Sequence, residues 1–185
     1  MKKMIGSIMD KQHETSPRFT LDDLHVGQRF TSRTHRIDEA EIKAFAGSFD
    51  PQPFHLDGDA ARDSIFKGLA ASGWHTAAIT MRLNVEGGLP FAGGLVGAGA
   101  DITWPTATRP GDILHVESEV VEIVPSRSRP DRGMAKIQSR TINQKGEVVQ
   151  ILNAKMILPR STSPELGERR CEHLTSSTTA KKSAS

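Results

Sequence analysis

GWHTAAITMRLNV, residues 73–85, is the most strongly patterned segment of the chain. Apolar side chains recur in it at steps of three and four residues, which predicts an amphipathic helix; they are Trp74, Ala77, Ala78, Met81 and Val85. Ile79 and Leu83 place further apolar groups on the opposite face. A helix that is apolar on nearly all sides is expected to be buried, and the small residues near its start would let a sheet approach closely.

The segments that follow this helix predict strands. They cover residues 95–103, 112–124, 134–143 and 147–158. In the last of them, apolar residues alternate with Asn153 and Lys155, which is the two-residue period of a half-buried strand. Gly111 and Gly146 mark turns that lead into two of these strands, because glycine accepts the positive φ that tight turns need.

The segment before the helix predicts one strand and shorter helices. A strand is expected over residues 28–35, and Asp38 is expected to cap a helix that ends at Gly47. Two prolines within residues 50–56 argue against a regular helix there. One strand, a helical region and several long strands predict an α+β domain, in which an antiparallel sheet packs on one long helix.

Length and composition fit a single domain with polar tails. The chain has 185 residues, of which 36% are hydrophobic and 25% charged, and a domain usually has about 100–200 residues. Residues 1–17 lack periodicity, and residues 160–185 are rich in Ser, Thr, Lys and Glu. Such segments bury too little apolar surface to offset the entropy of ordering. We therefore expect a disordered arm at 1–17, a folded domain at 18–159 and a disordered tail at 160–185.

Charge, cysteine content and hydropathy exclude several classes of protein. A formal net charge of +2 is too small to predict a nucleic-acid-binding surface. Cys171 is the only cysteine, so no disulfide can form within the chain. The first residues hold no apolar run typical of a signal peptide, and no segment approaches the length of a membrane span. We expect a soluble cytoplasmic protein that binds neither nucleic acid nor membrane.

The segment Asp50-Pro51-Gln52-Pro53-Phe54-His55 carries the most informative pair of ionisable residues. Its prolines stiffen the turn and can hold Asp50 and His55 in a set relation. A carboxylate beside an imidazole can act as general base and general acid. Hydration of a conjugated thioester needs such a pair, because one proton leaves water and another reaches the α-carbon, while donors stabilise charge on the thioester oxygen. The alternative is that Asp50 is a turn or cap residue and His55 a solvated loop histidine.

Other candidate sites are weaker. His75 lies on the expected buried helix, where a core role is favoured, and His115 has no spaced partner for a metal. No cysteine–histidine spacing typical of zinc occurs. The glycines within 93–99 do not form a dinucleotide or phosphate loop. We therefore expect no metal site.

The proline-containing segment resembles the signature of the MaoC-like family and of the (R)-specific enoyl-CoA hydratases within it, Gly-Asp-x-Asn-Pro-x-His-x-Asp. The matching residues are 50–57, and the resemblance continues at 66–74, where the family has a small loop and the start of its central helix. It continues again at 104–105 and 109–112, and in all it covers about residues 20–158. The resemblance implies a hotdog fold, an antiparallel sheet wrapped around one long central helix.

The resemblance also implies roles for particular residues. Asp50 and His55 take the positions of a catalytic dyad, and the backbone N–H of Gly73 would face the thioester oxygen from the start of the central helix. Close packing is the alternative role of Gly73. Gln52 stands in place of the signature's Asn, and Phe49 in place of its Gly, which leaves the dyad intact and puts the shape of the pocket in doubt.

Three residues flank these positions and are candidate substrate contacts. Ser72 replaces the His that precedes the helix glycine in the family. Trp74 and Phe54 are bulky, and beside the site they would favour a short or compact acyl chain. A place in the core is the favoured role for both.

The activity implied by the resemblance is that of an acyl-CoA hydratase/dehydratase, a hydro-lyase of fatty acid metabolism. It adds water reversibly to a trans-2-enoyl thioester and gives the (R)-3-hydroxyacyl thioester. The resemblance implies a homodimer or higher homo-oligomer with its pocket at or near the subunit interface. The substrate brings its own coenzyme A, and no bound cofactor is expected. A hotdog acyl-CoA thioesterase and a non-catalytic acyl-CoA-binding module are the alternatives, and the acyl chain, the carrier and the direction stay open.

Overall fold

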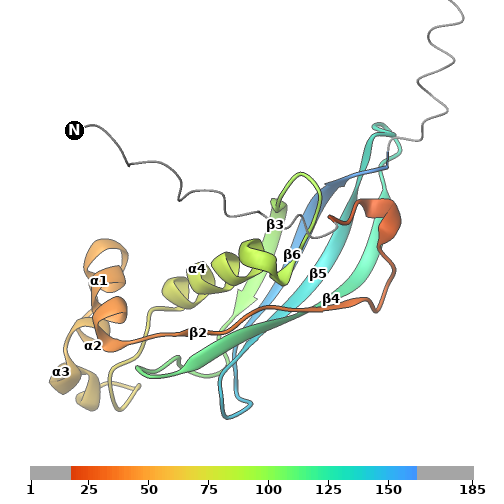
Figure 1. The fold of residues 1–185 in the computed structure, drawn as a ribbon. Coiled ribbons are helices and arrows are strands. Elements are labelled where there is room, and N and C mark those ends of the chain that lie inside the picture. The colour runs from red at the N-terminus through yellow and green to blue at the C-terminus, as the bar shows by residue number, and fades with distance from the viewer. Residues whose placement is uncertain (1–17, 162–185) are drawn as a thin grey trace, which may run out of the picture.

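The computed structural model describes residues 18–161, in which an antiparallel sheet lies against one long helix (Figure 1). The elements are η1 (Leu21–Asp23), β1 (Arg29–Thr31), β2 (His35–Arg36), α1 (Glu39–Phe49), α2 (Pro53–Leu56), α3 (Gly58–Asp63), α4 (Gly73–Leu83), η2 (Asn84–Gly88), β3 (Val96–Thr103), β4 (Ile113–Pro125), β5 (Arg132–Ile142) and β6 (Val148–Pro159). This order confirms the predicted α+β class, and the arrangement is the one expected of a hotdog domain. The predicted arm at 1–17 and residues 162–185 of the predicted tail lie outside the described residues.

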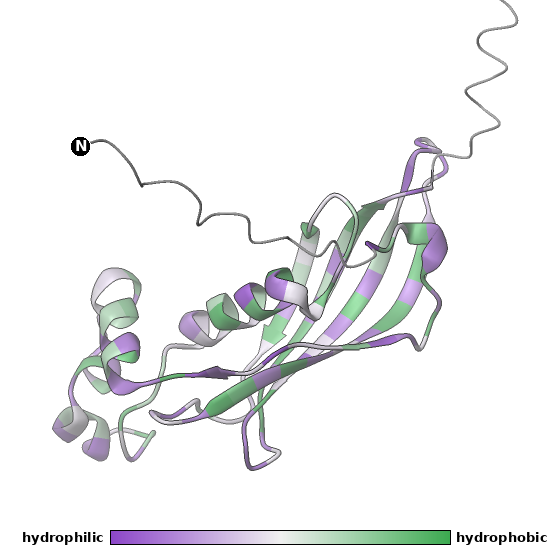
Figure 2. Ribbon diagram, in the orientation of Figure 1, coloured by the Kyte–Doolittle hydropathy of each residue, from purple (hydrophilic) through white to green (hydrophobic). Residues whose placement is uncertain are grey.

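All strand pairs of the sheet are antiparallel, and their order is β1-β4-β5-β6-β3, with β2 also paired to β4. The four long strands begin and end within two residues of the predicted ranges. Hydrophilic and hydrophobic residues alternate along β5 and β6 (Figure 2), because one face of the sheet meets the core and the other does not. β3 forms one edge, and all its residues except Ile102 are exposed.

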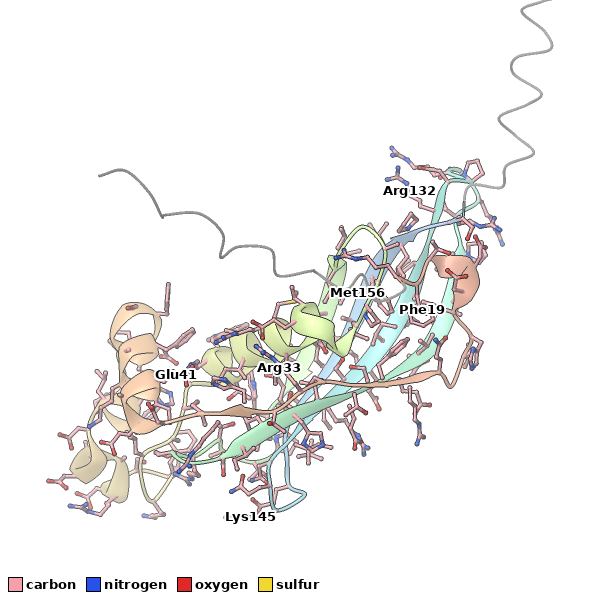
Figure 3. The ribbon with its side chains drawn as sticks, in the orientation of Figure 1. Phe19, Arg33, Glu41, Arg132, Lys145 and Met156 are labelled. Atoms are coloured by element: carbon pink, nitrogen blue, oxygen red, sulfur yellow. The ribbon has the colours of Figure 1, made fainter. Side chains whose placement is uncertain are left out.

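Two groups of buried apolar side chains form the core. One joins α4 to the sheet and to the segment before α1, and its members are Ile37, Ile42, Ala71, Ile79, Leu83, Leu114, Val116 and Val149. The other lies over the far part of the sheet, where Phe19 packs against a cluster that includes Met156 (Figure 3). α1, α2 and α3 gather at one end of the molecule, beside the start of α4 (Figure 1).

The prediction that α4 is buried on nearly all sides is wrong. Trp74, Met81 and Val85 are 61%, 43% and 62% exposed. The sheet covers only the opposite side of the helix, where the buried residues are His75, Thr76, Ile79, Thr80 and Leu83. Thr76 and Thr80 tolerate burial because their hydroxyls are hydrogen-bonded. No helix within residues 18–161 is long and apolar enough to cross a bilayer.

The N-terminal elements follow the prediction in part. The expected strand over 28–35 is divided into β1 and β2, which pair separately with β4. Asp38 caps α1 as predicted, since its carboxylate accepts a hydrogen bond from the Glu41 N–H. Gly47 does not end α1, which continues to Phe49.

Prolines determine where α1 ends and where α2 begins. α1 stops where Asp50 precedes Pro51, and Asp50 leaves the helical region with φ −151° and ψ 67°; a residue before proline disfavours the helical conformation. The prediction of no regular helix within 50–56 is wrong for its last four residues, because α2 begins at Pro53. Proline is tolerated at the first helical position, where its missing N–H would have no helical partner.

Candidate active site

The six residues proposed from the sequence all line one cavity of about 420 Å³. They come from the end of α1, from α2 and from the start of α4, and they are Asp50, Phe54, His55, Ser72, Gly73 and Trp74. The rest of the lining consists of Gln52, Ile65, Phe66, Ala71, Thr76, Trp104, Thr106, Ala107, Thr108 and Val149. The cavity therefore lies where the helical end of the domain meets the sheet.

The turn between α1 and α2 brings the proposed dyad together. Asp50 is the C-cap residue of α1, and His55 lies on α2, only a few residues further along the chain. His55 Nε2 lies 3.4 Å from Asp50 Oδ2, and the side chains are 5% and 18% exposed. Both groups face the same cavity, so a bound molecule could contact both at once.

The orientation of the His55 ring is set by a backbone carbonyl. His55 Nδ1 lies 2.7 Å from the carbonyl oxygen of Ala70. A carbonyl only accepts, so Nδ1 carries a hydrogen, and in the neutral ring Nε2 is the nitrogen with the lone pair. Arg109 holds the loop that leads to Ala70, because its guanidinium donates to the carbonyl oxygens of Phe66, Gly68 and Leu69.

Both oxygens of Asp50 accept hydrogen bonds. Ser72 Oγ donates to Oδ2 at 2.6 Å, and Gln52 Nε2 donates to Oδ1 at 2.7 Å. The bond from Ser72 holds the pKa of Asp50 below its usual value; partial burial opposes this, and Gln52 and the nearby His55 lower the pKa further. Asp50 is therefore a carboxylate at neutral pH, ready to accept a proton.

Gly73 is closely packed, and the geometry of its N–H is compatible with the donor role that the family resemblance implies. It is the first residue of α4, and its N–H has no acceptor among residues 18–161. A free N–H at a helix N-terminus is a donor for a partly negative oxygen. A Cβ at this position would lie 2.8 Å from the indole of Trp104, so close packing also requires glycine here.

Aromatic rings form much of the cavity wall. Phe54 packs edge-on against His55, with ring centroids 4.6 Å apart, and lies 5.0 Å from Phe66. Trp74 contacts Trp104 in an edge-to-face arrangement at 5.6 Å. The favoured core role of Trp74 is wrong, because its side chain is exposed, whereas Phe54 is half-buried between His55 and the cavity.

The structure adds Trp104 and Gln52 to the site, although neither was proposed from the sequence as a site residue. Trp104 lies directly after β3 and reaches the cavity only because the chain folds back over α4. Gln52, a departure from the family signature, takes part by bonding Asp50. The sequence signal that could have identified Gln52 is its position between Pro51 and Pro53. The prolines that restrict the backbone next to Asp50 also restrict the backbone of Gln52.

The weaker candidates stay outside the cavity. His75 is buried as predicted and stacks on Phe45 with centroids 4.5 Å apart, but its Nδ1 has no partner in the described part of the chain. Burial lowers its pKa, and Glu41, whose carboxylate lies 4.0 Å away, opposes that effect. Over residues 18–161 no three His, Cys, Asp or Glu side chains are grouped closely enough to hold a metal ion.

The chain is similar to a known protein family, to a curated protein and to several solved structures. Residues 21–141 match the family described as the MaoC like domain. A Bacillus subtilis protein, uncharacterized YdeM, is 34% identical over 128 residues, which cover 68% of this chain and 88% of that protein. The crystal structure of a MaoC-like dehydratase from Rhodospirillum rubrum is 61% identical, covers 78% of this chain and 99% of its own, and superposes with a TM-score of 0.77. The R-hydratase PhaJ1 of Pseudomonas aeruginosa is 29% identical with a TM-score of 0.63, over 78% of this chain and 88% of that one.

Proposed function

The chain belongs to the MaoC-like family of hydratases and dehydratases, and on this basis we propose that it is a hydro-lyase that acts on an acyl-CoA. It adds water reversibly to a trans-2-enoyl-CoA and gives a 3-hydroxyacyl-CoA. The observation that carries this proposal is the position of His55 Nε2, 3.4 Å from Asp50 Oδ2, in the cavity that Gly73 also lines. A carboxylate, an imidazole and a free backbone donor are the three groups that the reaction needs.

In the proposed mechanism, Asp50 and His55 exchange protons with the reacting water and carbon. Asp50 takes one proton as the water oxygen bonds to the β-carbon, and protonated His55 delivers its Nε2 proton to the α-carbon. The Gly73 N–H stabilises the negative charge that develops on the thioester oxygen. The proton on Asp50 then returns to His55 Nε2 over the 3.4 Å that separates them, so the site is restored. Dehydration follows the same steps in reverse.

The substrate carries its own coenzyme A, and the reaction as proposed uses no further cofactor. The similarity to an R-hydratase supports an (R)-configured product. Stereochemistry depends on which face of the double bond meets the water that the dyad activates.

We also propose that two copies of the chain pair through β3 and α4. β3 is an exposed sheet edge with unpaired backbone groups. The α4 stripe, formed by Trp74 and Met81 on α4 and by Val85 at the start of η2, exposes apolar side chains on the same molecule. Trp74 contacts Trp104 just beyond the end of β3, so the edge and the stripe adjoin near the cavity. A second copy that covers both would bury more than about 1,200 Å² in total, as stable complexes do.

The decisive experiment follows the enoyl chromophore and the thiol in parallel. With crotonyl-CoA we expect loss of the enoyl absorbance, no release of free thiol, and (R)-3-hydroxybutyryl-CoA on chiral analysis. Release of free thiol together with crotonate, and without 3-hydroxybutyryl-CoA, would establish the thioesterase alternative instead. Tight binding of acyl-CoA with neither reaction would establish a binding module.

A further inference from the structure

Trp104 lines the same cavity as the dyad and packs against the backbone of Gly73. A Cβ on Gly73 would meet three atoms of its indole, Cε2, Cδ2 and Cζ2, at 2.8, 2.9 and 3.1 Å. The ring is thus in contact with a residue that lines the cavity and whose N–H has no acceptor within residues 18–161. A substrate whose thioester oxygen binds that N–H must place its neighbouring carbons beside the indole.

The indole is tied in place although it is 40% exposed. Its Nε1 donates to Gln150 Oε1 at 2.9 Å. Gln150 is completely buried, and its Nε2 donates to Thr80 Oγ1 at 3.0 Å. Thr80 in turn is hydrogen-bonded to Thr141 at 2.6 Å and donates to the carbonyl of Thr76. The chain of bonds joins the end of β3 to β6, α4 and β5, so the ring cannot swing away without leaving a buried amide unpaired.

We propose that Trp104, held by Gln150, limits the substrate to a short, uncharged acyl group. This inference rests on the proposed hydratase function and specifies which thioesters the site accepts. Trp104 acts as the fixed wall that determines acyl size, and Gln150 acts as a positioning residue for that wall.

The lining of the cavity supports both parts of the proposal. Among residues 18–161, the only ionisable side chains that line it are Asp50 and His55, and no Lys or Arg of this part of the chain is there to pair with a second carboxylate on the acyl group. A charged acyl group would instead meet the carboxylate of Asp50. The volume of about 420 Å³ is near the lower end of the roughly 300–1,000 Å³ usual for small-molecule pockets. The thioester and part of the pantetheine must share that volume with the acyl chain.

The test compares acyl chains in the wild type and in Trp104 variants. For the wild type we expect kcat/KM to be highest with crotonyl-CoA and to fall at least tenfold for trans-2-octenoyl-CoA, since each unaccommodated methylene is worth about tenfold or more. In Trp104→Ala the ratio of octenoyl-CoA to crotonyl-CoA kcat/KM should rise by about tenfold.

Trp104→Leu is a second variant that keeps an apolar side chain in case the alanine variant folds poorly. Val124→Ala removes a similarly exposed apolar group far from the cavity and should leave the ratio unchanged.

The role of Gln150 is tested with Gln150→Met, which keeps the approximate volume and removes the acceptor for the indole. If Gln150 only stabilises the fold, the variant lowers the melting temperature and leaves the ratio as it was. If it positions Trp104, the ratio moves toward that of Trp104→Ala.

Binding of saturated acyl-CoA separates failure of this inference from failure of the proposed function. Butyryl-CoA and octanoyl-CoA cannot be hydrated, and calorimetry gives their affinities whether or not the protein is an enzyme. We expect the wild type to favour butyryl-CoA and Trp104→Ala to lose that preference. Turnover with an unchanged chain-length ratio in Trp104→Ala, or a wild type that prefers octanoyl-CoA, overturns the inference. A wild type that hydrates no enoyl-CoA overturns the proposed function, while the two affinities still decide the role of Trp104.

Discussion

Asp50 receives both of its side-chain hydrogen bonds from neighbours that are fixed without any substrate. Ser72 is held by its place at the start of α4, where its hydroxyl also accepts the Trp74 N–H, and Gln52 is held between two prolines. His55 is fixed independently by the carbonyl of Ala70. The dyad is therefore organised before binding, which is the condition for efficient proton transfer.

Removing either member of the dyad should abolish most activity. Asp50→Asn keeps the shape and removes the base, and His55→Gln keeps some hydrogen bonding and removes the proton donor. General acid–base groups contribute about 10²–10⁴-fold each, so we expect kcat for crotonyl-CoA to fall at least about a hundredfold. Affinity for butyryl-CoA should change much less.

The matched controls are Asp63→Asn and His25→Gln, at exposed positions outside the cavity. Near wild-type hydration by both dyad variants would show that the assignment is wrong.

Ser72 should determine the pH at which activity is lost in acid. Its bond is the main cause of the low pKa of Asp50, and the ionised form of Asp50 is the active base. Ser72→Ala removes that bond and raises the pKa, so the acid limb of the kcat/KM profile should move to higher pH. Ser72→Thr keeps the hydroxyl and should restore the limb toward the wild type. Ser48→Ala, which removes an exposed hydroxyl on α1, is the control. An acid limb that does not move in Ser72→Ala would contradict this role.

At the scale of secondary structure, the N-terminus of α4 is the element on which the site is built. Ser72 caps the helix, Gly73 lines the cavity as its first residue, and Trp104 packs on the same glycine. A Cβ at position 73 would point at the Trp104 indole. The residue whose backbone N–H is the proposed hydrogen-bond donor therefore also has to be glycine. Gly73 is therefore constrained both by its packing against Trp104 and by its proposed role as an N–H donor.

Gly73→Ala tests that constraint. Alanine favours helices by up to about 1 kcal/mol over glycine, but overpacking against a fixed ring costs about 1–3 kcal/mol. We expect a lower melting temperature and a kcat/KM reduced by about tenfold or more, since misplacement of catalytic groups is costly.

The controls for Gly73→Ala use the same substitution elsewhere and a double variant. Gly47→Ala lies within α1 where no atom is within 4 Å of the added Cβ, so it should preserve or raise the melting temperature. Trp104→Leu combined with Gly73→Ala should recover part of the lost stability. Additive effects of the two substitutions would show that the contact between them carries no strain.

At the scale of the whole molecule, the described chain leaves two features without a partner. The β3 edge offers backbone groups to a further strand, and the stripe of α4 offers apolar side chains. Soluble monomers seldom expose an apolar stripe beside an open strand edge. A second copy that covered both would also shield the mouth of the cavity from water, which strengthens the electrostatic contacts inside it.

Charge placed in the α4 stripe should prevent this pairing. Met81→Glu introduces a carboxylate at a position that is 43% exposed in the single chain and would be buried in the dimer. We expect sedimentation velocity at micromolar concentration to show a dimer for the wild type and a mainly monomeric variant. Val124→Glu, near the end of β4 and also 43% exposed, should remain dimeric. A monomeric wild type would refute the proposed pairing.

The amino-acid sequence predicted the elements whose signals are local. The period-two pattern placed the last long strand, Asp38 was identified as a cap from its neighbours, and the two prolines predicted that Asp50 and His55 lie close together. Such features depend on contacts along one short segment, and a short segment carries its own steric and hydrogen-bonding constraints. The resemblance to a family then placed Gly73 near the dyad, and the structure brings all six proposed residues to one cavity.

The tertiary structure alone decided which side of α4 meets the sheet and which distant side chains reach the cavity. A helix that is apolar on several sides has no single preferred face, so its periodicity could not show that Trp74, Met81 and Val85 would remain exposed. Trp104 and Gln150 are 46 positions apart, and only the pairing of β3 with β6 and their packing on α4 brings them together. The local pattern of the sequence determined the strands, the caps and the dyad, because short-range sterics and hydrogen bonds act within each segment. The wall of the pocket and the uncovered face of the helix were decided by packing between segments, which no single segment encodes.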